Sequence, residues 1–360
     1  MKHLSEYRDK DLAQNLIAAI RARSKKPVRL MEVCGTHTVA IFRHGIRQVL
    51  PETIQLISGP GCPVCVTATE EIDRAVKLAR IPDVMVTTFG DLIRVPGSHS
   101  SLQRERAGGA DVRMVYSTFD ALQLAQENPD KKVVFLAIGF ETTAPTIAAA
   151  VLESQRLGLE NFFILSAHKL LPPALEALLS SGKLAIQGFI YPGHVTTIIG
   201  TAAYEQVART YRVPGVVCGF EPVDILETIL RLVEQIEQGR ARVEIQYKRA
   251  VNAEGNPKAL AILRQVFVPC DAPWRGLGLI PGSGLTLRPE FRALAAEDHF
   301  DLQVPPAQDH PGCACGEVLL GTKTPPDCRL FRTVCRPDSP LGPCMVSTEG
   351  TCAAYYKYQE

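Results

Sequence analysis

A short apolar strand, a polar turn with glycine and then a helix form a unit that recurs along residues 28–225. Strands that alternate with helices predict parallel sheets joined by right-handed crossovers. In such sheets, ligands bind outside the carboxyl ends of the strands. The predicted strands are Val28–Val33, Ile54–Ile57, Val84–Thr88, Val133–Ile138, Phe162–Ser166, Ala185–Ile190 and Gly215–Val217.

The chain has 360 residues, more than the roughly 100–150 of a typical single domain. We therefore expect an α/β protein with two Rossmann-like parallel-sheet domains and a smaller, irregular domain at the C-terminus. The expected boundaries are 1–27 for an N-terminal helix packing on the other domains, 28–125 and 126–245 for the α/β domains, and 246–360 for the last. After residue 304 the sequence becomes rich in Pro, Gly and Cys and poor in core residues. That part therefore needs another source of stability, such as a metal cluster.

Charge and hydropathy exclude several classes of protein. The 39 Lys and Arg nearly balance the 38 Asp and Glu, which gives no reason to expect nucleic-acid binding. The longest apolar stretches are strand-length, shorter than the roughly 20 residues of a membrane span. The first residues lack the apolar core of a signal peptide, so we expect a cytoplasmic protein without a membrane segment.

The chain contains 11 cysteines, and six of them lie between Cys313 and Cys352. In a protein without a signal peptide, clustered cysteines indicate metal binding or redox chemistry rather than a disulfide framework. Four thiolates suit either structural zinc or a [4Fe–4S] cluster. Well-separated single cysteines favour the iron–sulfur cluster, because zinc ligands usually come as close pairs. The favoured ligands are Cys313, Cys328, Cys335 and Cys352, with Cys315 and Cys344 as extras.

Two further thiol motifs follow the first two predicted strands. Cys62 and Cys65 form a CxxC motif before a helix, where exposed N–H groups stabilise a thiolate. No second CxxC completes a zinc site, which favours a redox pair. Cys34 and His37 share one turn and are suited to bind iron or zinc, or to form a nucleophile and its base. A buried small thiol beside a capping histidine would explain the same residues.

Other polar residues at strand ends carry weaker signals, since structural roles explain them equally well. No phosphate-binding Gly-rich motif supports nucleotide hydrolysis. The weaker candidates are Asp91, Arg94, Ser98, Glu141, Glu221, His168, His194 and Cys218, whereas Cys270 has no supporting context.

Several stretches together resemble the HypD family of [NiFe]-hydrogenase maturation proteins, in the same order over nearly the whole chain. They are residues 32–38 around Cys-Gly-Thr-His, 59–65 around Cys-Pro-Val-Cys, 89–98, 139–145 with Gly-Phe-Glu-Thr-Thr, and the tail 342–358. One departure is Val39, where some relatives carry a second histidine.

The resemblance implies two α/β domains and a third that carries a [4Fe–4S] cluster. It also implies a scaffold on which the Fe(CN)2CO group of the hydrogenase is assembled, with the small chaperone HypC and the cyanide donor HypE as partners. Cys34 would hold the iron together with a HypC cysteine, with His37 beside it. Cys62 and Cys65 would be the redox pair. The implied cluster ligands are Cys313, Cys328, Cys335 and Cys352.

Two alternatives to such a scaffold remain open from the sequence. One is a stand-alone disulfide reductase fed by an iron–sulfur cluster, and the other is a zinc-stabilised binding protein. The scaffold hypothesis routes electrons from the C-terminal cluster through Cys62 and Cys65 to the Cys34 site.

Overall fold

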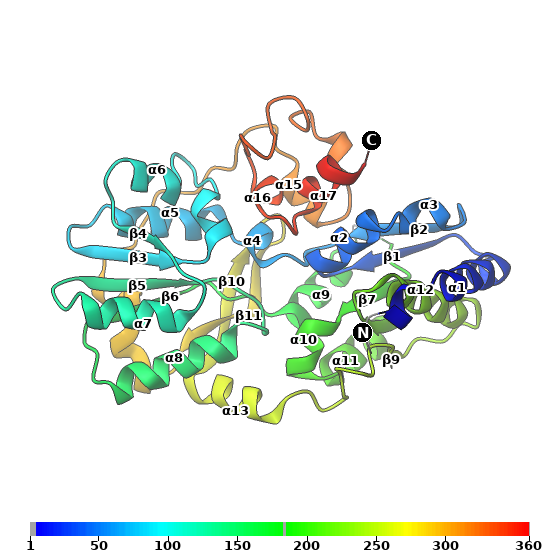
Figure 1. The fold of residues 1–360 in the computed structure, drawn as a ribbon, viewed down its shortest axis with the longest axis horizontal. Helices are drawn as coiled ribbons and strands as arrows, with labels where there is room; N and C mark the ends of the chain where they lie inside the picture. Colours follow the sequence, from blue (N-terminus) through cyan, green and yellow to red (C-terminus); the bar gives the residue numbers. More distant parts are fainter. Residues whose placement is uncertain (1–4, 183–184, 360) are drawn as a thin grey trace.

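The computed structural model describes residues 5–182 and 185–359. Two α/β domains lie side by side, and a segment rich in cysteine, residues 304–359, packs across the top where they meet (Figure 1). The predicted fold class, two Rossmann-like parallel sheets and an irregular cysteine-rich C-terminal part, is confirmed.

The first domain is built on a parallel sheet of five strands in the order β2-β1-β7-β8-β9. Successive residues of a strand face opposite sides, so each strand contributes to two cores. Met31 and Tyr191 face α9 and α11, whereas Leu30 and Ile190 face α1 and α12. The strands are β1 (Val28–Glu32), β2 (Ile54–Ser58), β7 (Gly188–Pro192), β8 (Gly215–Cys218) and β9 (Val243–Ile245).

The second domain is built on a parallel sheet of four strands in the order β4-β3-β5-β6. Helices α5 and α6 cover one face, and α7 and α8 cover the other (Figure 1). Along β5, Val133 and Phe135 pack toward α7 and α8, and Val134 packs toward α5. The strands are β3 (Val84–Thr88), β4 (Val112–Met114), β5 (Lys132–Ala137) and β6 (Phe162–Ser166).

The domains are not consecutive in the chain, so the expected boundaries 28–125 and 126–245 do not each enclose a sheet. The chain forms β1 and β2, crosses to complete the second sheet, and returns for β7, β8 and β9. Each apolar strand would be buried on both faces in the expected sheet and in the observed one. Its composition therefore does not reveal which sheet it joins.

The helices have the following bounds: α1 Lys10–Arg23, α2 Gly35–Arg43, α3 Ile46–Val49, α4 Pro63–Val66, α5 Thr69–Ala79, α6 Leu102–Ala107, α7 Thr118–Glu127, α8 Ala144–Arg156, α9 Leu171–Ser180, α10 Gly193–Ile199, α11 Ala202–Tyr211, α12 Pro222–Glu237, α13 Pro257–Val266, α14 Ala296–His299, α15 Cys315–Leu319, α16 Pro343–Val346 and α17 Thr351–Tyr358. Short 3-10 helices occupy Ser5–Arg8, Gly90–Arg94, Pro289–Leu294 and Pro325–Asp327.

The expected N-terminal helix is α1, which spans Lys10–Arg23 between the N-cap Asp9 and the C-cap Ser24. It packs on α12 of the first domain and buries Ile20 completely. Leu12 of the same helix remains 44% exposed.

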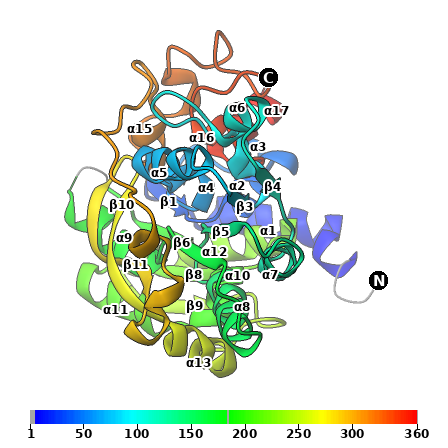
Figure 2. The ribbon, with the colours of Figure 1, turned by 90° about the vertical axis from the view of Figure 1, so that its left-hand side faces the viewer.

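Residues 246–302 do not belong to the cysteine-rich part, contrary to the expected boundary 246–360. Helix α13 packs on α8, and the antiparallel hairpin of β10 (Phe267–Trp274) and β11 (Gly278–Leu287) extends the cores of both α/β domains. Figure 2 shows this hairpin running along one side of the molecule. Its Pro and Gly content hides the strand pattern, because neither residue is typical of a strand interior.

The cysteine-rich segment has little regular structure beyond α15, α16 and α17. Helix α16 packs on α4, and α17 packs on α2. The segment therefore lies directly over the turns that follow β1 and β2.

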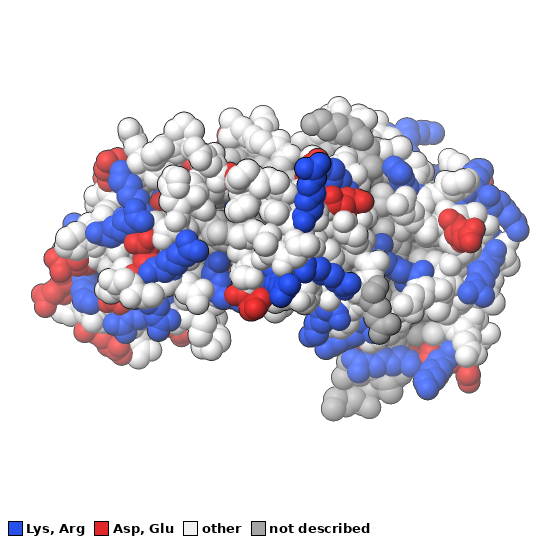
Figure 3. Space-filling view, turned by 90° about the horizontal axis from the view of Figure 1, so that it is seen from above, with Lys and Arg blue, Asp and Glu red and all other residues white. Residues whose placement is uncertain are grey.

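In the view from above, the middle of the face carries few charged side chains, while both signs alternate at the left-hand end (Figure 3).

Candidate functional site

The turns that carry Cys34 and the CxxC motif lie against each other, because β1 and β2 are adjacent and parallel. The Gly35 N–H donates to the Gly61 carbonyl at 3.1 Å. A side chain at Gly61 would have its Cβ 2.1 Å from the Cys34 nitrogen, so only glycine allows this approach. The two motifs, 28 positions apart from Cys34 to Cys62, thus form one site.

Cys34 is the N-cap residue of α2, so the N–H groups of Thr36 and His37 lie close to its sulfur. Burial raises the pKa of Cys34 to about 11 and the nearby Glu349 carboxylate adds to the increase, although the N–H groups of His37 and Thr36 oppose it. Cys34 is therefore a protonated thiol at neutral pH, and a cationic metal would replace its proton.

His37 is completely buried, and its Nε2 lies 2.9 Å from the Gly219 carbonyl oxygen. A carbonyl only accepts, so Nε2 carries the proton and Nδ1 keeps its lone pair. That Nδ1 has no partner within the described part of the chain. Burial lowers the pKa of His37 to about 4, so the ring stays neutral. A neutral imidazole with one nitrogen anchored and the other free is suited to bind a metal.

An aromatic stack fixes the His37 ring in this orientation. Phe220 stacks on His37 at 4.6 Å between ring centroids and on His194 at 3.9 Å. His194, a weak candidate in the sequence, therefore lies beside the site, stacked on the same phenylalanine as His37.

Glu349 is a site residue that the sequence did not single out. Its Oε1 accepts a hydrogen bond from Thr36 Oγ1 at 2.7 Å, beside Cys34. A Cβ on Gly35 would lie 2.6 Å from the Glu349 Cβ, so glycine is needed there as well. The only signal in the sequence is the tail motif around residue 349, which does not reveal a contact across 313 positions.

Cys62 and Cys65 begin the short helix α4, with Cys62 as its N-cap. The two Sγ atoms lie 2.7 Å apart, and the Cys65 N–H donates to the Cys62 sulfur at 3.3 Å. Burial opposes ionisation of Cys65, but hydrogen bonds from Cys344 and Cys62 outweigh it and lower the pKa of Cys65 to about 6. Burial raises the pKa of Cys62, as does its hydrogen bond to Cys65. The pair therefore shares one proton near neutral pH.

Cys344 connects the CxxC motif to the C-terminal thiols. Its Sγ lies 2.9 Å from the Cys315 Sγ, and hydrogen bonds with Cys315, Cys352 and Cys65 raise the pKa of Cys344. Cys344 and Cys315 are 1% and 5% exposed, respectively, so this contact is shielded from water. The sequence marked both only as extra cysteines.

The six C-terminal cysteines line one small cavity of about 20 Å³ together with apolar side chains. Burial raises the pKa of Cys313 to about 12, with Cys315, Cys328 and Cys352 contributing charge repulsion. The Leu341 N–H donates to the Cys335 sulfur at 3.4 Å. A Cβ on Gly342 would lie 2.9 Å from the Cys313 sulfur.

The donor set at this cavity, six thiols, is of the type that holds an iron–sulfur cluster or a single soft metal ion. Within the described residues, no three His, Cys, Asp or Glu side chains converge as the ligands of one metal ion. A cubic cluster spreads its thiolates around a larger body, and N–H donors to sulfur are typical of its environment. Cys315 and Cys344 form a close pair, Cys352 is hydrogen-bonded to Cys344, and Cys313, Cys328 and Cys335 line the rest of the cavity.

The remaining sequence candidates have structural partners. Glu221 receives a hydrogen bond from Arg8 at 2.9 Å, and Cys218 is buried beside the Gly219 carbonyl. The Glu141 Oε1 accepts from the Leu171 N–H at 2.9 Å, while burial raises the pKa of Glu141 to about 7. His168 and Cys270 line a separate cavity behind the β10–β11 hairpin.

Comparison with known proteins places these features in one family. The HypD family model, described as "Hydrogenase formation hypA family", matches residues 11–359. The hydrogenase maturation factors HypD of Rhizobium leguminosarum bv. viciae and Azotobacter vinelandii are each 49% identical, over 99% of this chain and 96% and 97% of theirs. The HypD of Escherichia coli is 45% identical over 100% of this chain and 99% of its own.

The described helices include none with the length and apolar character needed to cross a bilayer. The family model, the relatives and the order of the cysteine motifs all indicate the same family. The chain therefore belongs to the HypD family of hydrogenase maturation factors.

Proposed function

We propose that this chain is the scaffold on which the Fe(CN)2CO group of a [NiFe] hydrogenase is assembled. The observation that carries the proposal is the arrangement of the thiols. Cys34 lies against the turn of Cys62 and Cys65, Cys65 contacts Cys344, and Cys344 contacts Cys315. These residues come from three separate parts of the chain, and simple packing of small side chains does not require such a series.

The cargo iron would bind at Cys34. Iron with cyanide and carbonyl ligands is soft and is suited to a thiolate, while the free Nδ1 of His37 offers a second donor or a hydrogen-bond acceptor. At 9%, Cys34 is more exposed than Cys62 or Cys65, so the small chaperone HypC would add its own cysteine at this edge. HypE would deliver cyanide to the same edge. The proposal assigns the chain to the cytoplasm, where thiols remain reduced.

Cys313, Cys328, Cys335 and Cys352 would hold a resident [4Fe–4S] cluster, which supplies single electrons when bound. The protein thiols then exchange a disulfide. Cys344 gives up its proton and attacks Cys65 of an oxidised Cys62–Cys65 pair, which breaks the bond to Cys62, and the released Cys62 takes the proton because its pKa is raised. Cys315 next attacks Cys344 and releases Cys65, so two electrons move from the Cys315–Cys344 dithiol to the CxxC pair. The low pKa of Cys65 makes it a good leaving group in the second step.

Burial of the CxxC pair argues against a stand-alone disulfide reductase. Cys65 is fully buried and Cys62 is 4% exposed. A disulfide of another protein cannot reach these sulfurs, whereas the neighbouring turn of Cys34 already touches their own turn.

The test is anaerobic co-expression with HypC and HypE, followed by infrared spectroscopy of the purified complex. We expect C≡N and C≡O stretching bands with the wild-type chain. A Cys62→Ala/Cys65→Ala variant should lose them because the electron route is cut.

Cys270→Ala is the matched control, since Cys270 lies outside the series of thiols and should leave the bands intact. Normal bands in the Cys62→Ala/Cys65→Ala variant would disprove the thiol route. Missing bands in the wild-type complex, with all partners present, would disprove the scaffold role itself.

A further inference from the structure

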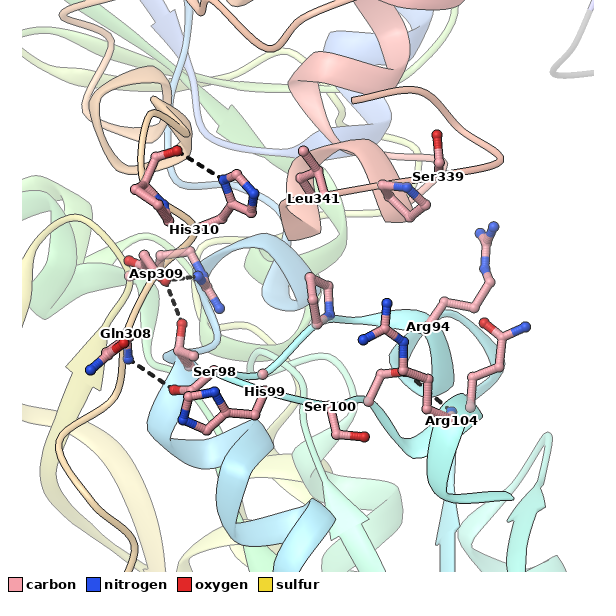
Figure 4. Close-up of a pocket in the computed structure, with 18 of the residues that line it drawn as sticks. Arg94, Ser98, His99, Ser100, Arg104, Gln308, Asp309, His310, Ser339 and Leu341 are labelled. Carbon is pink, nitrogen blue, oxygen red and sulfur yellow. Dashed lines mark hydrogen bonds and ion pairs between the residues drawn. The ribbon is translucent and has the colours of Figure 1, made fainter. Parts of the chain in front are cut away.

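A polar pocket of about 630 Å³ lies between the second domain and the cysteine-rich segment, and no step of the proposed function uses it. This volume is within the roughly 300–1,000 Å³ of small-molecule sites. Figure 4 shows Arg94 and Arg104 on one side and Asp309 and His310 across from them. The pocket includes the Arg94 and Ser98 motif that the sequence analysis left without a role.

The position of the pocket is that of a ligand site in an α/β protein. Residues 96–101 form the loop that follows β3, at the carboxyl end of the second sheet. The Ser98 hydroxyl donates a hydrogen bond to Asp73 Oδ2 at 2.6 Å and accepts one from the Gln308 N–H at 2.8 Å. These bonds fix the loop against the cysteine-rich segment.

Arg275 is the buried cation of this pocket. Its side chain is 6% exposed, and its Nε donates to the Thr67 carbonyl at 3.1 Å. Nη2 is buried and has no hydrogen-bond partner within the described residues. A guanidinium normally uses its donors on carboxylate or phosphate oxygens, so this one retains unused capacity.

A carboxylate already occupies part of the site. Asp309 Oδ1 accepts from both Arg275 Nη1 and Thr69 Oγ1, although the Asp309 side chain itself is 57% exposed. An exposed side chain on an irregular segment can swing away at little cost. Asp309 thus marks the chemical group that the site recognises.

A second arginine faces the same space without being neutralised. Arg104 is exposed and makes no ion pair with any residue that the structure describes, whereas Arg94 is held by the Val346 carbonyl at 2.9 Å. Arg104 therefore supplies positive charge to a group entering the pocket.

We propose that this pocket binds a small oxyanion, a phosphate or a carboxylate group, between Arg275 and Arg104. The ligand displaces the Asp309 carboxylate from Arg275 and uses the hydroxyls of the loop after β3 as further donors. None of the residues that line this pocket is a cysteine, although the charge of Arg275 contributes to lowering the pKa of Cys65.

The test is isothermal titration of the full-length chain, prepared anaerobically, with inorganic phosphate and separately with acetate. We expect one site per chain for at least one of the anions. Arg104→Ala should weaken it about tenfold, the loss of one charge-assisted hydrogen bond. Arg106→Ala, on the same helix but outside the pocket, should leave the affinity unchanged.

Asp309→Asn should tighten binding, because Arg275 then no longer has a competing carboxylate. Asp338→Asn removes the same charge from the pocket wall without freeing Arg275, and should tighten binding less. Phosphate binding alone would identify a phosphate ligand, and acetate binding alone a carboxylate. Failure of both anions to bind wild type and Asp309→Asn, or equal affinity in Arg104→Ala, would overturn the proposal.

Discussion

Cys65 is the thiol whose chemistry depends most on its neighbours. It is fully buried, which alone would suppress its thiolate, yet hydrogen bonds from Cys344 and Cys62 favour the ionised form. The CxxC spacing predicts a thiolate near a helix N-terminus, but the stronger stabilisation comes from Cys344, distant in the chain. The reactive sulfur is therefore a product of tertiary contacts.

The ionisation of Cys65 can be followed by NMR of isotope-labelled cysteine Cβ atoms, in chain prepared without iron to avoid paramagnetic broadening. The Cys65 signal should titrate with a midpoint at pH about 6, so the thiolate forms as pH rises through that value. In Cys344→Ala the midpoint should rise, because the largest favourable hydrogen bond is gone. A wild-type midpoint at the ordinary thiol pKa of 9.0 would contradict this account.

Helix α5 illustrates how an element is held by a buried ion pair that its own pattern does not predict. Its Glu71 is 8% exposed and accepts from the Ala68 N–H at 2.9 Å, as in a capping box. Lys169, after β6, is completely buried and lies 2.5 Å from Glu71. Burial raises the pKa of Glu71 against the opposing charge of Lys169. The pair ties α5 to the end of β6.

Lys169→Met should destabilise the chain by about 3–5 kcal/mol, because the Glu71 carboxylate is left buried without its cation. Urea unfolding at neutral pH measures the loss. The matched control is Lys77→Met on the same helix, whose ion pair with Asp301 is exposed and should matter little. Equal effects of the two substitutions would show that the buried ion pair contributes no more to the free energy of unfolding than the exposed one.

At the scale of the molecule, the cysteine-rich segment is held against the first domain by helix α17. Tyr355 packs edge-on against Phe42 of α2 at 4.5 Å between ring centroids. Arg47 lies over both rings and donates to the Leu56 carbonyl at 2.7 Å. Because Cys34 is the N-cap of α2, this contact fixes the C-terminal thiols relative to Cys34.

Tyr355→Ala should release the cysteine-rich segment before the α/β domains unfold. Truncating a buried aromatic side chain costs about 3–5 kcal/mol of stability. Here the lost contacts are those between α17 and α2. Hydrogen exchange should increase over residues 313–359 while β3, β5 and β6 remain protected. Tyr358→Ala, at the end of the same helix, leaves the Phe42 contact in place and should change exchange far less. A uniform rise over both sheets would refute local release.

The α/β class, the seven strands of the repeating unit and the N-terminal helix were predictable, because each depends on periodicity within a few residues. The thiol motifs were predictable for the same reason, since Cys34 and His37, or Cys62 and Cys65, are close in the chain. β4, β9 and the β10–β11 hairpin were missed, since they are short or contain Pro and Gly. After the last predicted strand, α12 ends at Glu237 and β9 follows it.

The chain by itself determined where the cysteines cluster and that Cys34 and the CxxC motif follow parallel strands. Only the tertiary structure decided that β1 and β2 join β7 rather than β3, and that Cys344, Glu349 and Arg275 meet turns hundreds of positions away. The physical reason is that the local sequence pattern determines which residues are buried and which face of a strand or helix they occupy. Contacts between buried polar groups depend instead on how whole elements pack.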